Sequence, residues 1–346
     1  DEAIVRPRLQ TATEVMASLI PPPRPCRPTN GPDPERRVAS FGGDLKALED
    51  PQPLSRILNF ALTDLMLEHG EIVMMGEDVG RKGGVYGVTQ KLQARFGPDR
   101  MIDTLLDEQS ILGLAIGMAQ NGFTPMPEIQ FLAYLHNAED QLRGEAATLP
   151  FFSHGQYTNP MVVRIAGLGY QKGFGGHFHN DNSVAVLRDI PGLILAVPST
   201  GADAARMLRE CVRLAREEQR LVVFLEPIAL YPMQDLHAEK DGAWMSVYPA
   251  PGDTIPLGKV GVHGKGSDLE ELGQALISVA LKAGAEAADA VAIRGTSLSI
   301  DVRGQALEHA ERSEGTDLGL RVFLGRRQAV VSASDTSART ITSSPM

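Results

Sequence analysis

The sequence contains few cysteines and no surplus of positive charge. Only Cys26 and Cys211 occur among its 346 residues, which excludes a disulfide framework or a cysteine-based zinc site and favours a reducing compartment. The formal net charge of −10 argues against a general nucleic-acid binder. No apolar run approaches the roughly 18 residues of a membrane span, and no signal peptide is visible. We therefore predict a cytoplasmic protein that binds neither nucleic acid nor membrane.

Proline is concentrated at the start of the chain, where "IPPPRPCRP" occupies residues 20–28. Such a stretch neither holds a helix nor pairs as a strand, so residues 1–52 are predicted to be a tail and linker. Only residues 9–20 show a helical pattern there. Because the chain begins with Asp1 and a linker, we expect it to be a piece of a larger polypeptide.

Residues 53–267 alternate between short apolar runs and amphipathic segments. The runs are typical of buried strands, and the segments between them have helical spacing. This alternation predicts an α/β domain with a mainly parallel sheet covered by helices on both faces. The expected strands are 71–79, 100–106, 124–131, 161–167, 193–199 and 221–227, and the expected helices are 53–70, 88–97, 109–121, 132–149 and 201–218.

The pattern changes in residues 268–346. One amphipathic helix is expected over residues 268–285, and period-2 runs at 289–315 and 317–335 predict antiparallel strands joined at glycines. No βαβ unit fits here. We predict a small α+β segment that follows the parallel-sheet domain.

Several acids and one glycine-rich loop lie at predicted strand ends. Glu77, Glu108, Glu128 and the loop 169–183 all lie at or just after the ends of expected strands, and ligands of parallel sheets bind beyond the carboxyl ends. These groups are therefore expected to share one rim. Glu108 has two interpretations: a helix-start acid favoured by the macrodipole, or a buried carboxylate that bonds a cofactor ring nitrogen and exchanges a proton.

Other residues also carry alternatives. His177 and His179, in "GGHFHNDNS", lack an obvious third ligand, so no metal site is predicted. They either hydrogen-bond the backbone or act as a proton donor or anion-orienting group at the mouth of a site. Tyr134 either packs in the core or stacks on a flat cofactor. Arg164 either forms a salt bridge or clamps an anion.

The ordered motifs "GEDVG", "GGVY", "IDT", "E..I.G.AIG.A", "EIQF..Y", "GGH.HND" and "VVFLEP..LY" resemble the beta subunit of the thiamine-diphosphate-dependent first component of 2-oxo acid dehydrogenase complexes. The resemblance covers residues 53–267, the pyrimidine-binding domain of a transketolase-like fold. It implies thiamine-diphosphate-dependent oxidative decarboxylation of a 2-oxo acid, with acyl transfer to lipoamide, in the bacterial cytoplasm. Pyruvate and branched-chain 2-oxo acids are the best-known substrates of such enzymes.

The resemblance assigns roles residue by residue. Glu108 matches the glutamate that hydrogen-bonds the cofactor's aminopyrimidine ring, and Tyr134 matches the aromatic residue under that ring. His179 matches the active-site loop histidine, although "HND" stands where many relatives have "HSQ". We further assign Glu77 to the cofactor and His177, with His179, to the substrate.

The resemblance also implies a partner. The Gly-Asp-Gly motif that binds the diphosphate and Mg²⁺ belongs to the alpha half of the family and is absent from this sequence. We expect an alpha-type subunit or an upstream alpha domain, an oligomer, and a lipoyl acyltransferase core. The isolated chain is expected to be inactive.

Residues 268–346 resemble the N-terminal part of the TldD/PmbA family of metallopeptidases and modulators, through "AGA..AD", "GLRVF.G" and "S.SD.S". Three origins are open: a misassembled or frame-shifted reading frame, a gene fusion, or a divergent form of the C-terminal domain that beta subunits carry. The alternative functions are a peptidase-related or interaction module and another transketolase-like thiamine enzyme.

Overall fold

A computed structural model describes residues 5, 7–26, 31–169, 175–259, 268–303, 306–324 and 327–334. The chain divides into two compact units, Asp1–Gly258 and Lys259–Met346. The boundary expected at 267/268 follows residues 260–267, which lie outside the described residues, so it stays a prediction. None of the helices described is long and apolar enough to cross a membrane.

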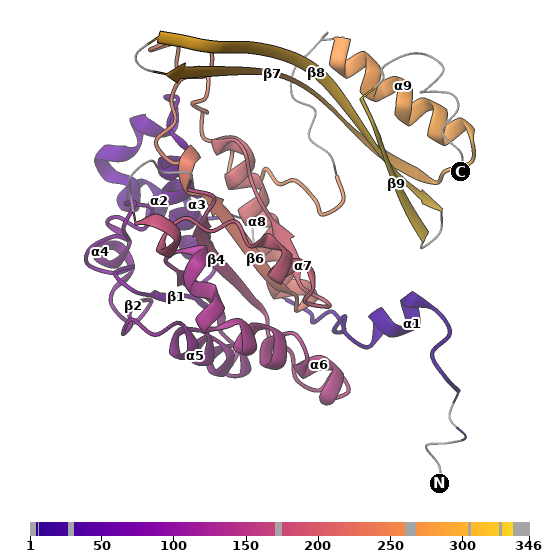
Figure 1. Cartoon of the computed structure of the whole chain (residues 1–346). Coiled ribbons are helices and arrows are strands. Elements are labelled where there is room, and N and C mark those ends of the chain that lie inside the picture. The colour runs from indigo at the N-terminus through magenta and orange to yellow at the C-terminus, as the bar shows by residue number, and fades with distance from the viewer. Residues whose placement is uncertain are drawn as a thin grey trace. The chain divides into compact units, whose positions relative to one another are not determined.

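The first unit is built on a six-stranded parallel sheet, which confirms the predicted fold class (Figure 1). The strand order is β2-β1-β3-β4-β6-β5. At the carboxyl edge, Gly76 of β1 pairs with Glu128 of β3, and Glu128 pairs with Arg164 of β4. The strands are β1 (Ile72–Gly76), β2 (Met101–Asp103), β3 (Thr124–Ile129), β4 (Met161–Gly167), β5 (Ile194–Ala196) and β6 (Leu221–Pro227).

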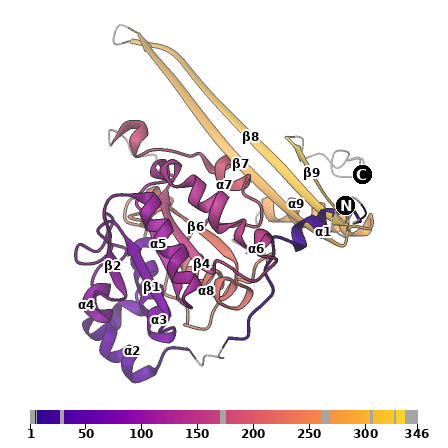
Figure 2. The ribbon, with the colours of Figure 1, turned by 90° about the horizontal axis from the view of Figure 1, so that it is seen from below.

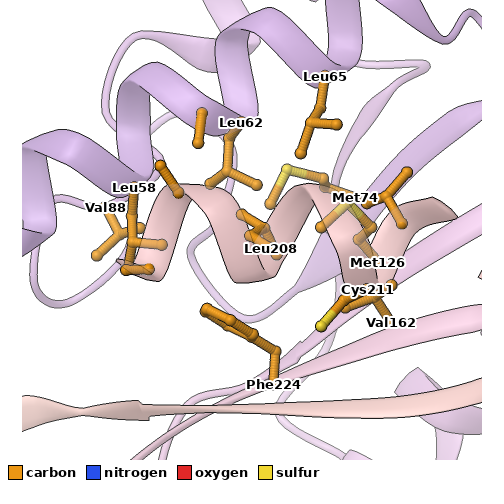
Figure 3. Packing of buried hydrophobic residues seen from close by; sticks show 14 of the residues in the cluster. Leu58, Leu62, Leu65, Met74, Val88, Met126, Val162, Leu208, Cys211 and Phe224 are labelled. Carbon is orange, nitrogen blue, oxygen red and sulfur yellow. The ribbon is translucent and has the colours of Figure 1, made fainter. Parts of the chain in front are cut away.

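Two hydrophobic layers hold helices to the two faces of this sheet (Figure 2). Successive β1 residues point to opposite faces, so Met74 joins one layer while Val73 and Met75 join the other. The first layer contains α3 (Leu54–Glu68) and α8 (Gly201–Glu218); Figure 3 shows Leu58, Leu62 and Leu65 of α3 packed with Leu208 of α8 and Phe224 of β6.

The second layer contains α5 (Glu108–Gln120) and the segment that follows β3. A continuous helix is expected over 132–149, but the chain instead forms a 3-10 helix (Leu132–Asn137), a π-helical turn (Gln141–Ala146) and α6 (Leu149–Phe152). Asn137 and Gly144 are poor helix formers, and Pro150 follows, which explains the interruptions. The smaller helices of this unit are α1 (Ala12–Ala17), α4 (Leu92–Phe96) and α7 (Val184–Arg188).

Part of the expected linker is folded. Asp33 caps α2 (Pro34–Phe41) by accepting from the Arg36 amide, and proline is tolerated in the first turn because that N–H has no intrahelical partner. Phe41 and Leu48 are buried in the main core. The prediction of a linker from proline content is therefore wrong for α2. The average composition of residues 1–52 does not reveal one well-capped helix within them.

In the second unit, the residues that the structure describes form a helix and an antiparallel sheet, as the sequence predicts. α9 (Asp268–Lys282) packs against β7 (Ala287–Arg303) and β8 (Ala306–Leu324). β8 lies between β7 and β9 (Arg327–Ala333), and both pairings are antiparallel.

Arg37 fastens α2 to the core, and its loss is expected to destabilise the first unit. Its guanidinium donates to both oxygens of the buried Asp64 at 2.7 and 3.2 Å, while the Tyr248 hydroxyl donates to the same carboxylate at 2.8 Å. Arg37→Ala leaves Asp64 with one of these two partners, so we expect a loss of about 1–3 kcal/mol in the free energy of unfolding. Urea unfolding monitored by circular dichroism measures it.

Arg36→Ala is the matched control, because Arg36 is the exposed neighbour on the same helix. Equal unfolding free energies for the two variants would contradict the role given to Arg37.

Candidate functional site

Glu108 begins α5 and is buried, with 5% of its surface exposed. Asp107 is the N-cap residue and makes no side-chain capping bond. Glu108 is the acid in the first turn, where the helix dipole favours negative charge. The one hydrogen bond found for its carboxylate in the described part of the chain comes from the Asn137 amide at 3.4 Å. The site therefore holds a buried carboxylate with spare acceptor capacity.

Glu77 follows the end of β1 and lies close to Glu108. At Gly76 a side chain would meet the Glu128 carbonyl oxygen at 2.8 Å, so only glycine lets β1 end beside β3. Burial, followed by the charges of Asp78 and Glu108, raises the pKa of Glu77. Two predicted cofactor residues thus repel each other across the rim.

Tyr134 and His179 meet at the same rim. The Tyr134 hydroxyl and His179 Nε2 are 3.0 Å apart, and the His179 ring stands edge-on to Phe131 with centroids separated by 4.6 Å. Burial, and then the charges of Glu77 and Glu108, raises the pKa of Tyr134. The structure therefore brings together four predicted site residues: Glu77, Glu108, Tyr134 and His179.

His177 does not join this group among the described contacts. It is exposed, and its ring packs on Phe178 with centroids 4.1 Å apart. Residues 170–174 of the predicted glycine-rich loop lie outside the described residues. Within the part of the chain that the structure describes, no cluster of three histidine, cysteine or acidic side chains is suited to a metal ion.

Gly175 sets the position of the His179 ring. Its φ of +66° is a left-handed conformation, and a β-carbon there would clash with His179 Nδ1. Only glycine accommodates both the turn and the folded-back ring. Because Gly175 and His179 are only four residues apart, this need for glycine is visible in the sequence "GGHFH" itself.

Arg164 forms a salt bridge rather than an open anion clamp. Its guanidinium donates to both oxygens of Glu226, at 2.6 and 2.9 Å, and to Glu128 at 2.7 Å. The Tyr231 hydroxyl donates to Glu226 at 2.6 Å. The adjoining cavity, of about 10 Å³, has room for one water molecule and not for an organic cofactor.

Glu128 therefore lies at the predicted rim but is occupied by Arg164. Burial raises the pKa of Glu128, and Glu226 adds to the rise while Arg164 opposes it. Sequence reasoning missed Glu226 and Tyr231, although both stand in "VVFLEP..LY". Their spacing of five residues carries no periodic signal, and only the pairing of β4 with β6 brings them to Arg164.

Removal of Arg164 is expected to be strongly destabilising. Arg164→Met leaves two buried carboxylates without their shared cation, so we expect a loss of about 3–5 kcal/mol in the free energy of unfolding. Arg188→Met removes an exposed pair with Asp189, whose side chains are 73% and 69% exposed, and is expected to leave the free energy of unfolding almost unchanged. Urea unfolding of both variants measures the difference, and similar losses would show that the Arg164 network is not a structural pair.

Comparison with known proteins identifies two families along the chain. Residues 51–234 match the family described as "Transketolase, pyrimidine binding domain", and residues 288–343 match "PmbA/TldA metallopeptidase domain 1". The second match confirms the predicted resemblance of the C-terminal segment.

Relatives of known function match the first part. The chain is 33% identical over 270 residues to "Pyruvate dehydrogenase E1 component subunit beta" of Bacillus subtilis, covering 73% of this chain and 77% of the relative. It is 36% identical over 217 residues to "2-oxoisovalerate dehydrogenase subunit beta" of Pseudomonas aeruginosa, covering 60% of each. A solved structure described as "Split gene transketolase, inactive beta4 tetramer" aligns over 68% of each chain with a TM-score of 0.45 and 17% identity.

The family match spans the sheet and the rim described above. Glu77, Glu108, Tyr134 and His179 all fall within residues 51–234. The chain therefore belongs to the transketolase pyrimidine-binding domain family, among the beta subunits of 2-oxo acid dehydrogenases.

Proposed function

We propose that residues 53–267 form the beta-type half of a thiamine-diphosphate-dependent active site for oxidative decarboxylation of a 2-oxo acid. The observation that carries this proposal is the buried Glu108 carboxylate, whose one described hydrogen bond is a long 3.4 Å contact. Burying a carboxylate without good partners costs several kcal/mol, so the site favours a donor from outside. The beta-subunit relatives support this interpretation over another transketolase-like enzyme.

The chain's residues fit the pyrimidine half of the cofactor. Glu108 offers a carboxylate to a ring nitrogen, and Tyr134, half-buried beside it, offers an aromatic surface. Glu77 adds negative charge next to Glu108, which favours a donor or a cation at the rim. When bound, thiamine diphosphate supplies an electron sink for the carbanion left as carbon dioxide departs.

The protein's part in the reaction is to orient groups and hold protons. Glu108 would exchange a proton with the ring nitrogen it bonds. His179, which touches the Tyr134 hydroxyl, would orient the substrate carboxylate or take up a proton at Nε2. His177 would contact the substrate from the exposed part of the same loop.

An alpha-type partner, as subunit or upstream domain, would complete the site. Leu105 and Leu106, just before Glu108, are 84% and 67% exposed, and open space surrounds Gly113 and Gly117 on α5. Such an apolar and smooth surface beside a buried acid favours a protein neighbour. The partner would hold the diphosphate and Mg²⁺, and a lipoyl acyltransferase core would accept the acyl group in a larger oligomer within the bacterial cytoplasm.

We also propose that residues 268–346 are foreign to this domain, as a gene fusion or a reading-frame artefact. The two family matches are separate, ending at residue 234 and starting at residue 288. Independent genomic reads across the junction test this. Continuous reads support a fusion, and reads that split there support an artefact.

Glu108→Gln is expected to slow decarboxylation strongly once the chain is assembled with an alpha-type subunit. The amide keeps the shape of the carboxylate and loses its proton exchange, so we expect a fall of about 10²- to 10⁴-fold in kcat. Glu145→Gln, an exposed acid outside the site, is the matched control. Steady-state release of carbon dioxide from pyruvate and from 2-oxoisovalerate measures both variants, and near wild-type turnover in Glu108→Gln would refute the proposed role.

Glu77→Gln is expected to stabilise the chain at neutral pH. Because the pKa of Glu77 is raised in the folded state, its ionisation lowers stability as pH rises through the window above the ordinary value of about 4.3. We expect the glutamine variant to gain a few tenths of a kcal/mol at about pH 7.5 and nothing at about pH 4. Urea unfolding at both pH values measures the gain, and a gain that is equal at both would contradict the electrostatic origin.

A further inference from the structure

The segment that carries His179 is tied to the 3-10 helix Leu132–Asn137 at two points. Tyr134 contacts His179, as described above, and His136 Nε2 lies 2.9 Å from Asp181 Oδ2. Both contacts join residues 45 apart in the sequence. The second contact lies outside the cluster of predicted site residues.

Asp181 is well placed to hold this contact. Its Oδ1 accepts from the Ser183 amide at 3.0 Å and from the Ser183 hydroxyl at 2.6 Å, which fixes the carboxylate and turns Oδ2 toward His136. A carboxylate only accepts, so His136 Nε2 carries the proton and donates. Burial raises the pKa of the Asp181 carboxyl, but the bonds from Ser183 and His136 outweigh it and lower the pKa.

The His179 ring is held in one tautomer when neutral. Nδ1 lies 3.3 Å from the Gly175 carbonyl oxygen, which only accepts, so Nδ1 carries the proton. Nε2 is then the acceptor for the Tyr134 hydroxyl. The Gly175 contact lies within the loop itself, whereas the Tyr134 contact joins the loop to the 3-10 helix. Loosening the loop from that helix would remove the Tyr134 contact and leave Nε2 free to compete with Nδ1 for the proton.

The start of this loop segment lies open to solvent. Gly175, Gly176, His177 and Phe178 are exposed, and both glycines have positive φ values of +66° and +51°. Glycines in this conformation leave an unfastened loop many alternatives, which makes ordering it costly. The polar contact of Asp181, at the other end of the segment, thus helps to hold the loop against the 3-10 helix.

We propose that His136 and Asp181 form a clasp that positions the His179 ring at the mouth of the site in its Nδ1–H form. They are positioning residues, since the His136 side chain is 47% exposed and neither residue contacts Glu108 or Tyr134 among the described contacts. The functional meaning of the clasp rests on the proposed function, whereas the clasp itself does not.

Nuclear magnetic resonance of the full chain with ¹⁵N-labelled histidine tests the clasp. The wild type is expected to show the Nδ1–H signature for His179, and His136→Ala is expected to shift it toward an average of the two tautomers. Hydrogen exchange of residues 175–183 is expected to rise about two- to five-fold in that variant, the range for a partly exposed ion pair. His237→Ala, which changes an exposed histidine in another loop, should alter neither readout.

Two further variants separate the clasp from the turn beside it. Asp181→Asn keeps an acceptor oxygen for Ser183 and removes the charge facing His136, so it should reproduce the His136→Ala shift. The double variant should shift no further than His136→Ala alone, because both changes remove the same contact. An unchanged His179 signature in His136→Ala, or fully additive shifts in the double variant, would overturn the proposal.

These readouts need neither cofactor nor partner, so their outcome is independent of whether the chain decarboxylates 2-oxo acids. With an alpha-type subunit, His136→Ala is expected to raise KM for the 2-oxo acid about two- to five-fold with kcat nearly unchanged. Absence of activity in the wild-type assembly would refute the proposed function and leave the clasp established by its spectra. A shifted signature with an unchanged KM would remove the functional part of the proposal.

Discussion

The placement of the site depends on the pairing of three charged residues inside the sheet. Arg164 of β4 lies between Glu128 of β3 and Glu226 of β6, and its guanidinium bonds both. A shift of one residue in the register of these strands would move Glu128 or Glu226 away from Arg164. It would then leave a buried carboxylate without a cation, which is costly. The network therefore fixes the register at the carboxyl ends of the strands that lead into the site.

This register explains how a repulsive cluster is maintained nearby. Glu128 of β3 pairs with Gly76 of β1. Glu77, which follows Gly76, therefore lies close to Glu108. Two acids at one rim lower the stability of the fold, whereas each carboxylate of the network behind them accepts a bond from the Arg164 guanidinium. The paired acids, Glu128 and Glu226, therefore stabilise the sheet. The poorly paired acids, Glu77 and Glu108, are the ones we propose for a ligand.

Sequence reasoning predicts the elements with simple periodicity and misses those that depend on distant contacts. The strands, α3, α5, α8 and the antiparallel C-terminal sheet follow from apolar spacing, and Glu108 at a helix start is visible in the sequence. Helix α2 escapes prediction because its capped start is embedded in a proline-rich stretch. The salt bridge of Arg164 stays open between two interpretations because its partners lie 36 and 62 residues away.

The exposed surface beside Glu108 supports the proposal that a partner protein completes the site. A site that binds a polar cofactor between two proteins keeps its apolar surroundings open until the second protein arrives, and Leu105 and Leu106 are exposed in this way. In the proposed assembly with an alpha-type partner, these leucines would be covered by the partner. The clasp between His136 and Asp181 would hold His179 at the same rim before the partner binds.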